Sequence, residues 1–103
     1  MSNPIVGTAG KIMVVAPELD QVAITTADST AWTITNSLGT SDSSGTLTYV
    51  SPLPVDGYED VAGWYANVTW PTAAGRYHVH MTITKSSAVM KWHEFVTVEA
   101  FVP

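Results

Sequence analysis

The last third of the chain alternates between apolar and polar side chains, and this pattern most limits the folds available. Residues 75–85 and 88–98 both alternate, and Ser86 and Ser87 lie between them. Alternation with a period of two is typical of strands with one buried face, and a short polar connection between them is typical of an antiparallel hairpin. A two-residue loop would place Lys85 opposite Ala88 and His80 opposite His93. The sequence therefore predicts a long hairpin with a defined register.

The two faces of this hairpin differ in polarity. We expect the buried face to carry Tyr77, Val79, Met81, Ile83, Met90, Trp92, Val96 and Val98. The solvent face would carry His78, His80, Thr82, Thr84, Lys91, His93 and Thr97. This register places Glu94 inside and Phe95 outside, so we expect a β-bulge near Glu94 to exchange them.

The start of the hairpin has the pattern of a tyrosine corner. Gly75 leads into Tyr77, whose hydroxyl would bond to backbone upstream, and Val79 stands where antibody domains place a cysteine. The alternative is that Tyr77 simply begins an ordinary strand.

The preceding sequence predicts short strands separated by turns. Strands are expected at residues 11–15, 21–26, 31–35, 45–50 and 64–70, each bounded by Gly, Pro, Ser or Asp. Residues 36–44 show no periodicity and are expected to form a loop that is mobile until it meets a partner. About seven strands without a helix predict a single-domain all-β fold, an antiparallel β-sandwich rather than a small barrel. The predicted divisions are an arm at 1–10, the sandwich at 11–100 and a tail at 101–103.

Composition limits the class of protein. A chain of 103 residues, 46% of them hydrophobic, is large enough for one core. The absence of Cys excludes disulfides and thiolate chemistry. A net charge of −5, with four Lys and Arg against nine Asp and Glu, argues against nucleic acid as a partner. We expect neither a secretory signal nor a membrane span, because no suitable apolar run is present.

No sequence motif indicates catalysis. The chain has no phosphate-binding loop, nucleophile elbow or zinc-protease helix, so we predict a protein without enzymatic activity, catalytic residues or cofactor.

Two groups of side chains raise the question of a metal. His78, His80 and His93 could share Zn²⁺ or Ni²⁺ on the solvent face of the hairpin. The alternative, which we favour, is three exposed imidazoles or a contact with a partner protein. The carboxylates within residues 56–60 could bind Ca²⁺, but their spacing matches no established loop, and a solvated acidic loop is the favoured interpretation.

The sequon at Asn67 lies mid-strand and is discounted as a glycosylation site. The four tryptophans could form a sugar-binding platform, but they share strand faces with apolar neighbours, which favours core packing for at least three. They are Trp32, Trp64, Trp70 and Trp92.

Three segments, Gly63–Pro71, Ala74–Val79 and Glu94–Val98, together resemble the C-terminal half of immunoglobulin-like structural proteins of tailed bacteriophages. In those proteins a strand ending near Pro leads to a Gly-x-Tyr corner and then to a last strand. The resemblance covers residues 45–100, whereas residues 1–44 match only in being strand-like. It implies an immunoglobulin-like sandwich in a virion, made in the host cytoplasm, as a capsid decoration or part of the head-to-tail connector.

This resemblance implies binding to neighbouring capsid or connector subunits, with homo-oligomerisation left open and no membrane partner. We expect contacts from loops 36–44 and 56–60 and from both chain ends. The residues expected to contact partners are Ile5, Val6, Asp56, Tyr58, Glu59 and Phe101. Those expected to support the fold are Trp64, Gly75, Tyr77 and Trp92. The rival functions are a carbohydrate-binding or adhesion module and an enzyme subunit or metal-handling sandwich.

Overall fold

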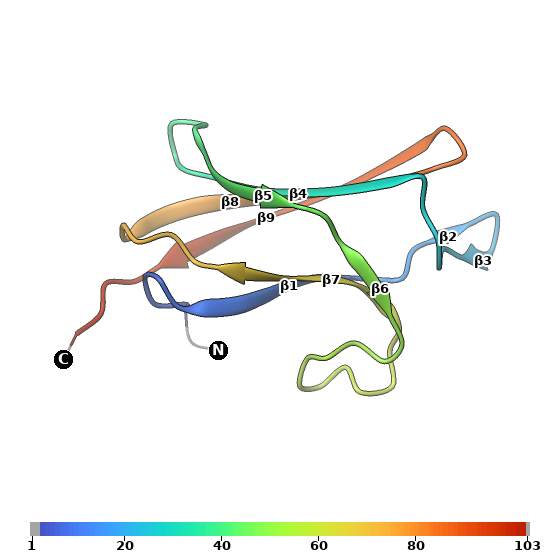
Figure 1. Ribbon diagram of the computed structural model, residues 1–103, viewed down its shortest axis with the longest axis horizontal. Helices are drawn as coiled ribbons and strands as arrows, with labels where there is room; N and C mark the ends of the chain where they lie inside the picture. Colours follow the sequence, from blue (N-terminus) through green and yellow to red (C-terminus); the bar gives the residue numbers. More distant parts are fainter. Residues whose placement is uncertain (1–2, 103) are drawn as a thin grey trace.

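The computed structural model describes residues 3–102, and in that range the chain is built of β-strands and turns without helices. The strands are shown in Figure 1. They are β1 (Ala9–Val15), β2 (Glu18–Leu19), β3 (Val22–Ala23), β4 (Ser29–Thr35), β5 (Ser41–Gly45), β6 (Thr48–Val50), β7 (Gly63–Thr69), β8 (Gly75–Lys85) and β9 (Ala88–Val98). The predicted all-β class is therefore confirmed. No helix that could cross a membrane is found within residues 3–102.

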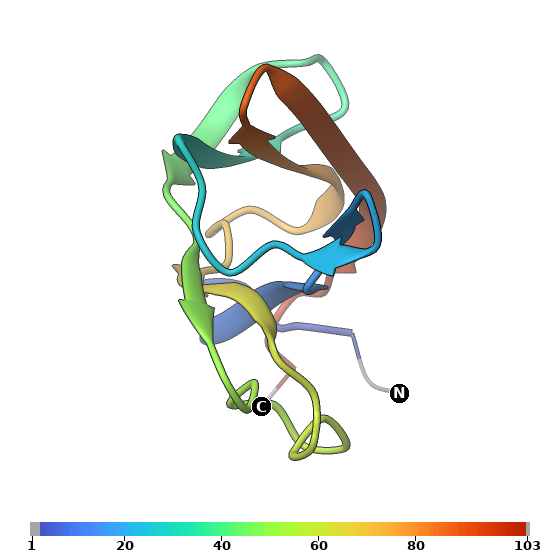
Figure 2. The same ribbon diagram turned by 90° about the vertical axis from the view of Figure 1, so that its right-hand side faces the viewer.

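The strands form two main antiparallel sheets. One has the order β1-β7-β6 and the other the order β5-β4-β8-β9, while β2 and β3 form a separate two-residue hairpin. Figure 2, which views the molecule end-on, shows the two sheets as opposed layers. This is a sandwich-like arrangement, and its core lies between the layers.

The core is made by the alternating inward side chains of both sheets. Ile34, Val79 and Ile83 are completely buried. Three of the four tryptophans are also buried, as predicted, and Trp92 is half-buried. The three-stranded sheet contributes Ile12, Val14, Trp64, Ala66 and Val68. The four-stranded sheet contributes Trp32, Ile34, Tyr77, Val79, Met81, Ile83 and Val98.

The β8–β9 hairpin has the predicted register. Lys85 pairs with Ala88 and His80 with His93. Ser86 and Ser87 have φ values of 50° and 73°, as a two-residue turn with both central residues left-handed requires.

The predicted bulge near Glu94 is wrong. Val79 pairs with Glu94 and Tyr77 with Val96, so the ladder continues without a shift. Because β9 is the edge of its sheet, Glu94 remains exposed although it lies on the core-facing side. A charge in this position disfavours pairing of the edge with a further strand, which is a common protection of edge strands.

The tyrosine corner is present. The Tyr77 hydroxyl donates a hydrogen bond of 2.7 Å to the carbonyl of Ala73, and the Tyr77 side chain is 7% exposed. The corner ties the connection between the two sheets to the start of β8.

The prediction of a loop at 36–44 is correct for its first part and wrong for its second. Residues 36–40 form an ordered turn, in which the Asn36 side-chain oxygen accepts hydrogen bonds from the backbone N–H groups of Leu38 (2.9 Å) and Thr40 (3.0 Å). The following residues form β5, which pairs with β4 through a register shift next to Thr35. An edge strand held by backbone pairing needs no apolar alternation, so this serine-rich strand was not apparent.

Two predicted strands differ from the observed strands by more than a shift of their ends. The strand expected at 45–50 is divided, because Leu47 is buried where the chain crosses between sheets. There the Thr30 hydroxyl accepts a hydrogen bond from the Leu47 N–H (2.9 Å) and donates one to the Leu47 carbonyl (3.1 Å). Of the strand expected at 21–26, only Val22–Ala23 forms, in the β2–β3 hairpin.

The N-terminal segment lies along the end of β9. Ile5 forms a parallel bridge with Glu99, and the Val6 N–H donates to the Glu99 carbonyl at 2.9 Å. Val6 also packs against the core, and β1 begins at Ala9, two residues before the predicted start.

Candidate functional site

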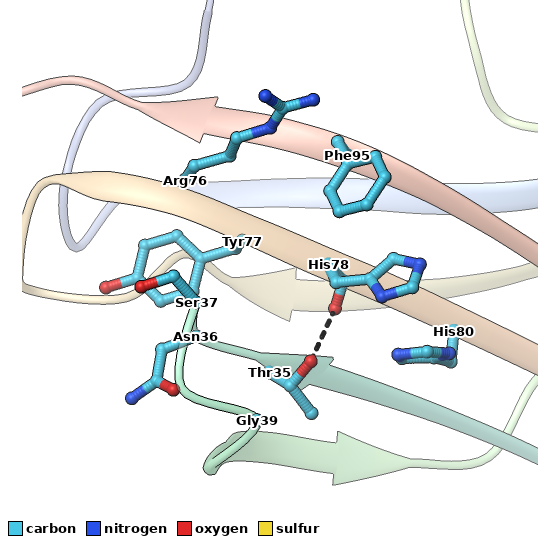
Figure 3. Close-up of a pocket in the computed structure, with 9 residues that line it drawn as sticks. All are labelled: Thr35, Asn36, Ser37, Gly39, Arg76, Tyr77, His78, His80 and Phe95. Carbon is cyan, nitrogen blue, oxygen red and sulfur yellow. Dashed lines mark hydrogen bonds between the residues drawn. The ribbon is translucent and has the colours of Figure 1, made fainter.

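A depression of about 520 Å³ lies on the outer face of the four-stranded sheet, beside the turn at 36–40 (Figure 3). We refer to it as the outer-face depression. It is lined by Thr35, Asn36, Ser37, Gly39, Arg76, Tyr77, His78, His80 and Phe95.

The strand registers bring these side chains together. Thr35 of β4 pairs with His78 of β8, and His78 pairs in turn with Phe95 of β9. Alternation then places Arg76 and His80 on the same face as His78. The Thr35 hydroxyl also donates a hydrogen bond of 3.4 Å to the His78 carbonyl (Figure 3). The depression is thus formed by three neighbouring strands and the hydrogen-bonded turn at 36–40.

Aromatic and cationic groups stack along this face. The guanidinium carbon of Arg76 lies 4.5 Å from the centre of the Phe95 ring. That ring stacks on the His78 imidazole, with centroids 4.5 Å apart and planes 16° apart. Cation–π contact is favourable in this geometry and holds an apolar ring at the surface. Phe95 is 57% exposed, so much of its surface remains accessible to a partner.

The three imidazoles form a second cluster around His78. The ring centroids of His78 and His80 are 3.8 Å apart, and Nε2 of His78 lies 2.9 Å from Nδ1 of His93. Partial burial lowers the pKa of His78, and the charges that His80 and His93 would carry lower it further. Neutral imidazoles can share this hydrogen bond, whereas two imidazolium rings would both be donors and could not. The cluster therefore resists protonation at His78.

The predicted proximity of the three histidines is confirmed, but the metal hypothesis gains no support. Within residues 3–102, no group of three or more His, Cys, Asp or Glu side chains is placed to hold a metal ion. This finding covers the carboxylates of residues 56–60 as well as the histidine cluster. The interactions that the histidine cluster does offer are hydrogen bonding and titratable charge.

The cationic side chains are concentrated on the β8–β9 hairpin. Residues 75–98 contain three of the four Lys and Arg residues and all three histidines, but only one of the nine Asp and Glu residues. That residue, Glu94, lies on the opposite side of β9 from Phe95. Asp42 is the one carboxylate on β4, β5 and β8. By strand alternation, Arg76 and Lys91 lie on the outer face of this hairpin with the three histidines, whereas Lys85 has the parity of the buried Ile83. The outer face of the hairpin thus carries two permanent cations and no carboxylate, in a protein that is acidic overall.

Residues 56–60, here called the acidic loop, are all exposed and project from the connection between β6 and β7 (Figure 1). The Tyr58 N–H donates to the Val55 carbonyl at 3.0 Å, and the Val61 N–H donates to the Tyr58 carbonyl at 3.1 Å. Hydrogen bonds from the backbone of Glu59 itself and of Gly57 lower the pKa of the Glu59 carboxyl. The loop thus presents three carboxyl side chains, those of Asp56, Glu59 and Asp60, close in sequence to Tyr58, which is 36% exposed.

The other predicted residues have varied positions. Ile5 and Val6 are half-buried, whereas Phe101, beyond β9, is exposed. Trp64 is a core residue whose indole N–H donates to the Ile24 carbonyl at 3.0 Å. Burial of the tryptophans noted above leaves no four-tryptophan platform for a sugar.

Sequence reasoning missed the main components of the outer-face depression. The loop at 36–44 is among the segments expected to contact partners, and its first part does border the depression. Arg76, Phe95 and their aromatic stack are not among the residues that the sequence predicts for binding. A usable signal was present, because Arg76 shares the strand parity of His78 and His80 and most cations fall on this hairpin.

Comparisons with protein-family models, curated proteins and solved structures found no match to this chain.

Proposed function

We propose that this chain is a non-enzymatic structural module of a tailed-bacteriophage particle, with an immunoglobulin-like topology, that binds neighbouring capsid or connector subunits. The observation that carries the binding role is the exposed stack of Arg76, Phe95 and His78 beside a preformed depression. Synthesis in the host cytoplasm and assembly into the virion are part of the proposal.

The strand order supports an immunoglobulin-like topology. The order β1-β7-β6 corresponds to strands B, E and D of that fold, and β5-β4-β8-β9 corresponds to C′, C, F and G. On this assignment Tyr77 lies near the start of strand F, at the corner between strands E and F, and the buried Trp32 lies on strand C. Both are positions where immunoglobulin domains carry these residue types. Val79, fully buried, replaces the cysteine of strand F.

The chemistry of the outer face supports protein binding. Arg and aromatic residues are enriched in interface cores and among the residues that dominate binding energy. The stack is preorganised by β8 and β9, and the Asn36 hydrogen bonds order the adjacent turn. Preorganisation reduces the entropy lost on binding. In a particle with many copies, individually weak contacts of this kind gain strength through avidity.

The assignment to a virion is supported by the resemblance of residues 63–71, 74–79 and 94–98 to phage structural proteins. The absence of cysteine agrees with assembly in a reducing cytoplasm.

Co-sedimentation with candidate phage particles tests this function. The wild-type chain should pellet with particles at a saturating ratio, and Phe95→Ser should weaken binding at least about tenfold. Val22→Ser is the matched control, because Val22 is also an exposed apolar residue but lies on the β2–β3 hairpin. The proposal fails if no particle binds the wild type. Equal loss in both variants would remove the outer face as the binding surface. A tryptophan fluorescence change with oligosaccharides, without particle binding, would favour the carbohydrate-binding alternative.

A further inference from the structure

We infer that the outer-face depression accepts the acidic loop of a second copy of this chain, so that copies associate head to tail. This inference names one partner of the proposed binding surface and in that sense rests on the proposed function.

Charge complementarity identifies the occupant. The depression is lined by a guanidinium and two imidazoles, and no carboxylate lines it. The acidic loop concentrates Asp56, Glu59 and Asp60, three of the nine carboxylate residues, within five positions. Arginine pairs with carboxylates through charge-assisted hydrogen bonds, often two at once. The depression therefore supplies a cation and hydrogen-bond donors, and the acidic loop supplies carboxylates.

Apolar groups on both surfaces add to this match. Phe95 lies within the depression, and Leu38, at the tip of the bordering turn, is 89% exposed. The acidic loop carries Tyr58 among its carboxylates, and a tyrosine ring can pack on Phe95 or on the Arg76 guanidinium. The volume of about 520 Å³ lies in the range of about 300–1,000 Å³ that is typical of pockets for small ligands. The outer-face depression is therefore large enough to accept the Tyr58 side chain of a second copy.

The placement of the two surfaces makes the contact intermolecular. Figures 1 and 2 show the acidic loop, between β6 and β7, on the opposite side of the molecule from the turn that joins β4 and β5 and borders the depression. The contact is therefore heterologous, joining two different surfaces. Repetition of a heterologous contact gives a ring when the rotation closes and a filament when it does not.

Charge reversal with complementation tests this contact. Sedimentation velocity over a concentration series at low ionic strength should show reversible self-association of the wild-type chain. Arg76→Glu and Glu59→Lys should each raise the dissociation constant by about tenfold or more, because each places like charges together. An equimolar mixture of the two variants should associate again. In that mixture the lysine introduced into the acidic loop of one variant meets the glutamate introduced into the depression of the other, and the unmodified loop and depression still match.

Two matched controls separate this contact from the effect of net charge. Lys11→Glu and Glu18→Lys make the same charge changes at exposed positions on β1 and β2. Both controls should associate as the wild type does. A wild-type chain that stays monomeric throughout the series overturns the inference, as does equal weakening by the controls and the test variants.

Co-sedimentation with particles separates failure of this inference from failure of the proposed function. A monomeric chain that still pellets with particles would overturn the self-association but leave the function intact. If Arg76→Glu releases the chain from particles while Glu59→Lys does not, the depression holds an acidic segment of another subunit, and the second copy is ruled out as its occupant.

Discussion

Removal of the Tyr77 hydroxyl should cost about 1 kcal/mol of folding stability. In Tyr77→Phe the ring stays in the core, and the 2.7 Å hydrogen bond to the Ala73 carbonyl is lost. A net hydrogen bond contributes about 0.5–1.5 kcal/mol. Because Ala73 is exposed, water can reach its carbonyl after the change, and the penalty of an unpaired buried group does not apply. At this chain length the loss corresponds to a fall in Tm of roughly 4 °C or slightly more.

Thermal and urea unfolding, followed by circular dichroism, measure this change. Tyr65→Phe is the control, because it deletes the hydroxyl of a half-buried tyrosine of β7 away from the corner. The urea m-value should be unchanged in both variants, since neither alters the surface exposed on unfolding. If Tyr77→Phe is as stable as the wild type, or no less stable than Tyr65→Phe, the corner contributes nothing specific and the reasoning is refuted.

Three further predictions concern separate parts of the sandwich. Gly10→Ala should destabilise the fold by about 1–3 kcal/mol, because the added Cβ would overlap the indole nitrogen of Trp70; an unchanged urea midpoint would contradict this. Replacing Ser86-Ser87 with Asn-Gly should raise stability by about 1 kcal/mol, since both positions are left-handed, and a lower Tm would refute the turn assignment. Because the pKa of His78 is lowered in the folded protein, the unfolded chain binds more protons than the folded chain just below the ordinary histidine pKa of about 6.5. The free energy of unfolding should therefore fall as pH falls through this window, and it should level off below the folded-state pKa. His78→Gln should reduce that dependence in Tm measurements across pH, and an equally steep profile in the variant would count against it.

The parts of the fold that could be predicted from sequence are those in which local pattern and packing agree. The β8–β9 register followed from alternation around a two-residue turn, and the corner followed from the spacing of Gly75 and Tyr77. In both the hairpin and the corner, side chains with strong burial preferences fix the register of the backbone. The burial of three tryptophans followed for the same reason.

The errors arose where tertiary context overrides local pattern. β5 is a polar strand held by pairing with β4, so its sequence carries no apolar period. We expect a bulge near Glu94 from sequence because a core-facing position usually buries its side chain, and burial of a charge is unfavourable. β9 is an edge strand, however, so the Glu94 side chain reaches solvent without a bulge. The outer-face depression depends on the β4–β8 register, which joins segments more than 40 residues apart in sequence. No single segment encodes that pairing.

Chemical-shift mapping tests most directly the claim that the outer face of the four-stranded sheet is the binding surface. Unlabelled chain is added to ¹⁵N-labelled chain, and the backbone amide shifts are followed. If this face is the binding surface, we expect shifts around Arg76, His78 and Phe95 and a second group in the acidic loop, with the β1 and β2 amides unmoved. Shifts confined to β1 and β6, or no shifts at concentrations where the chain associates, would contradict it.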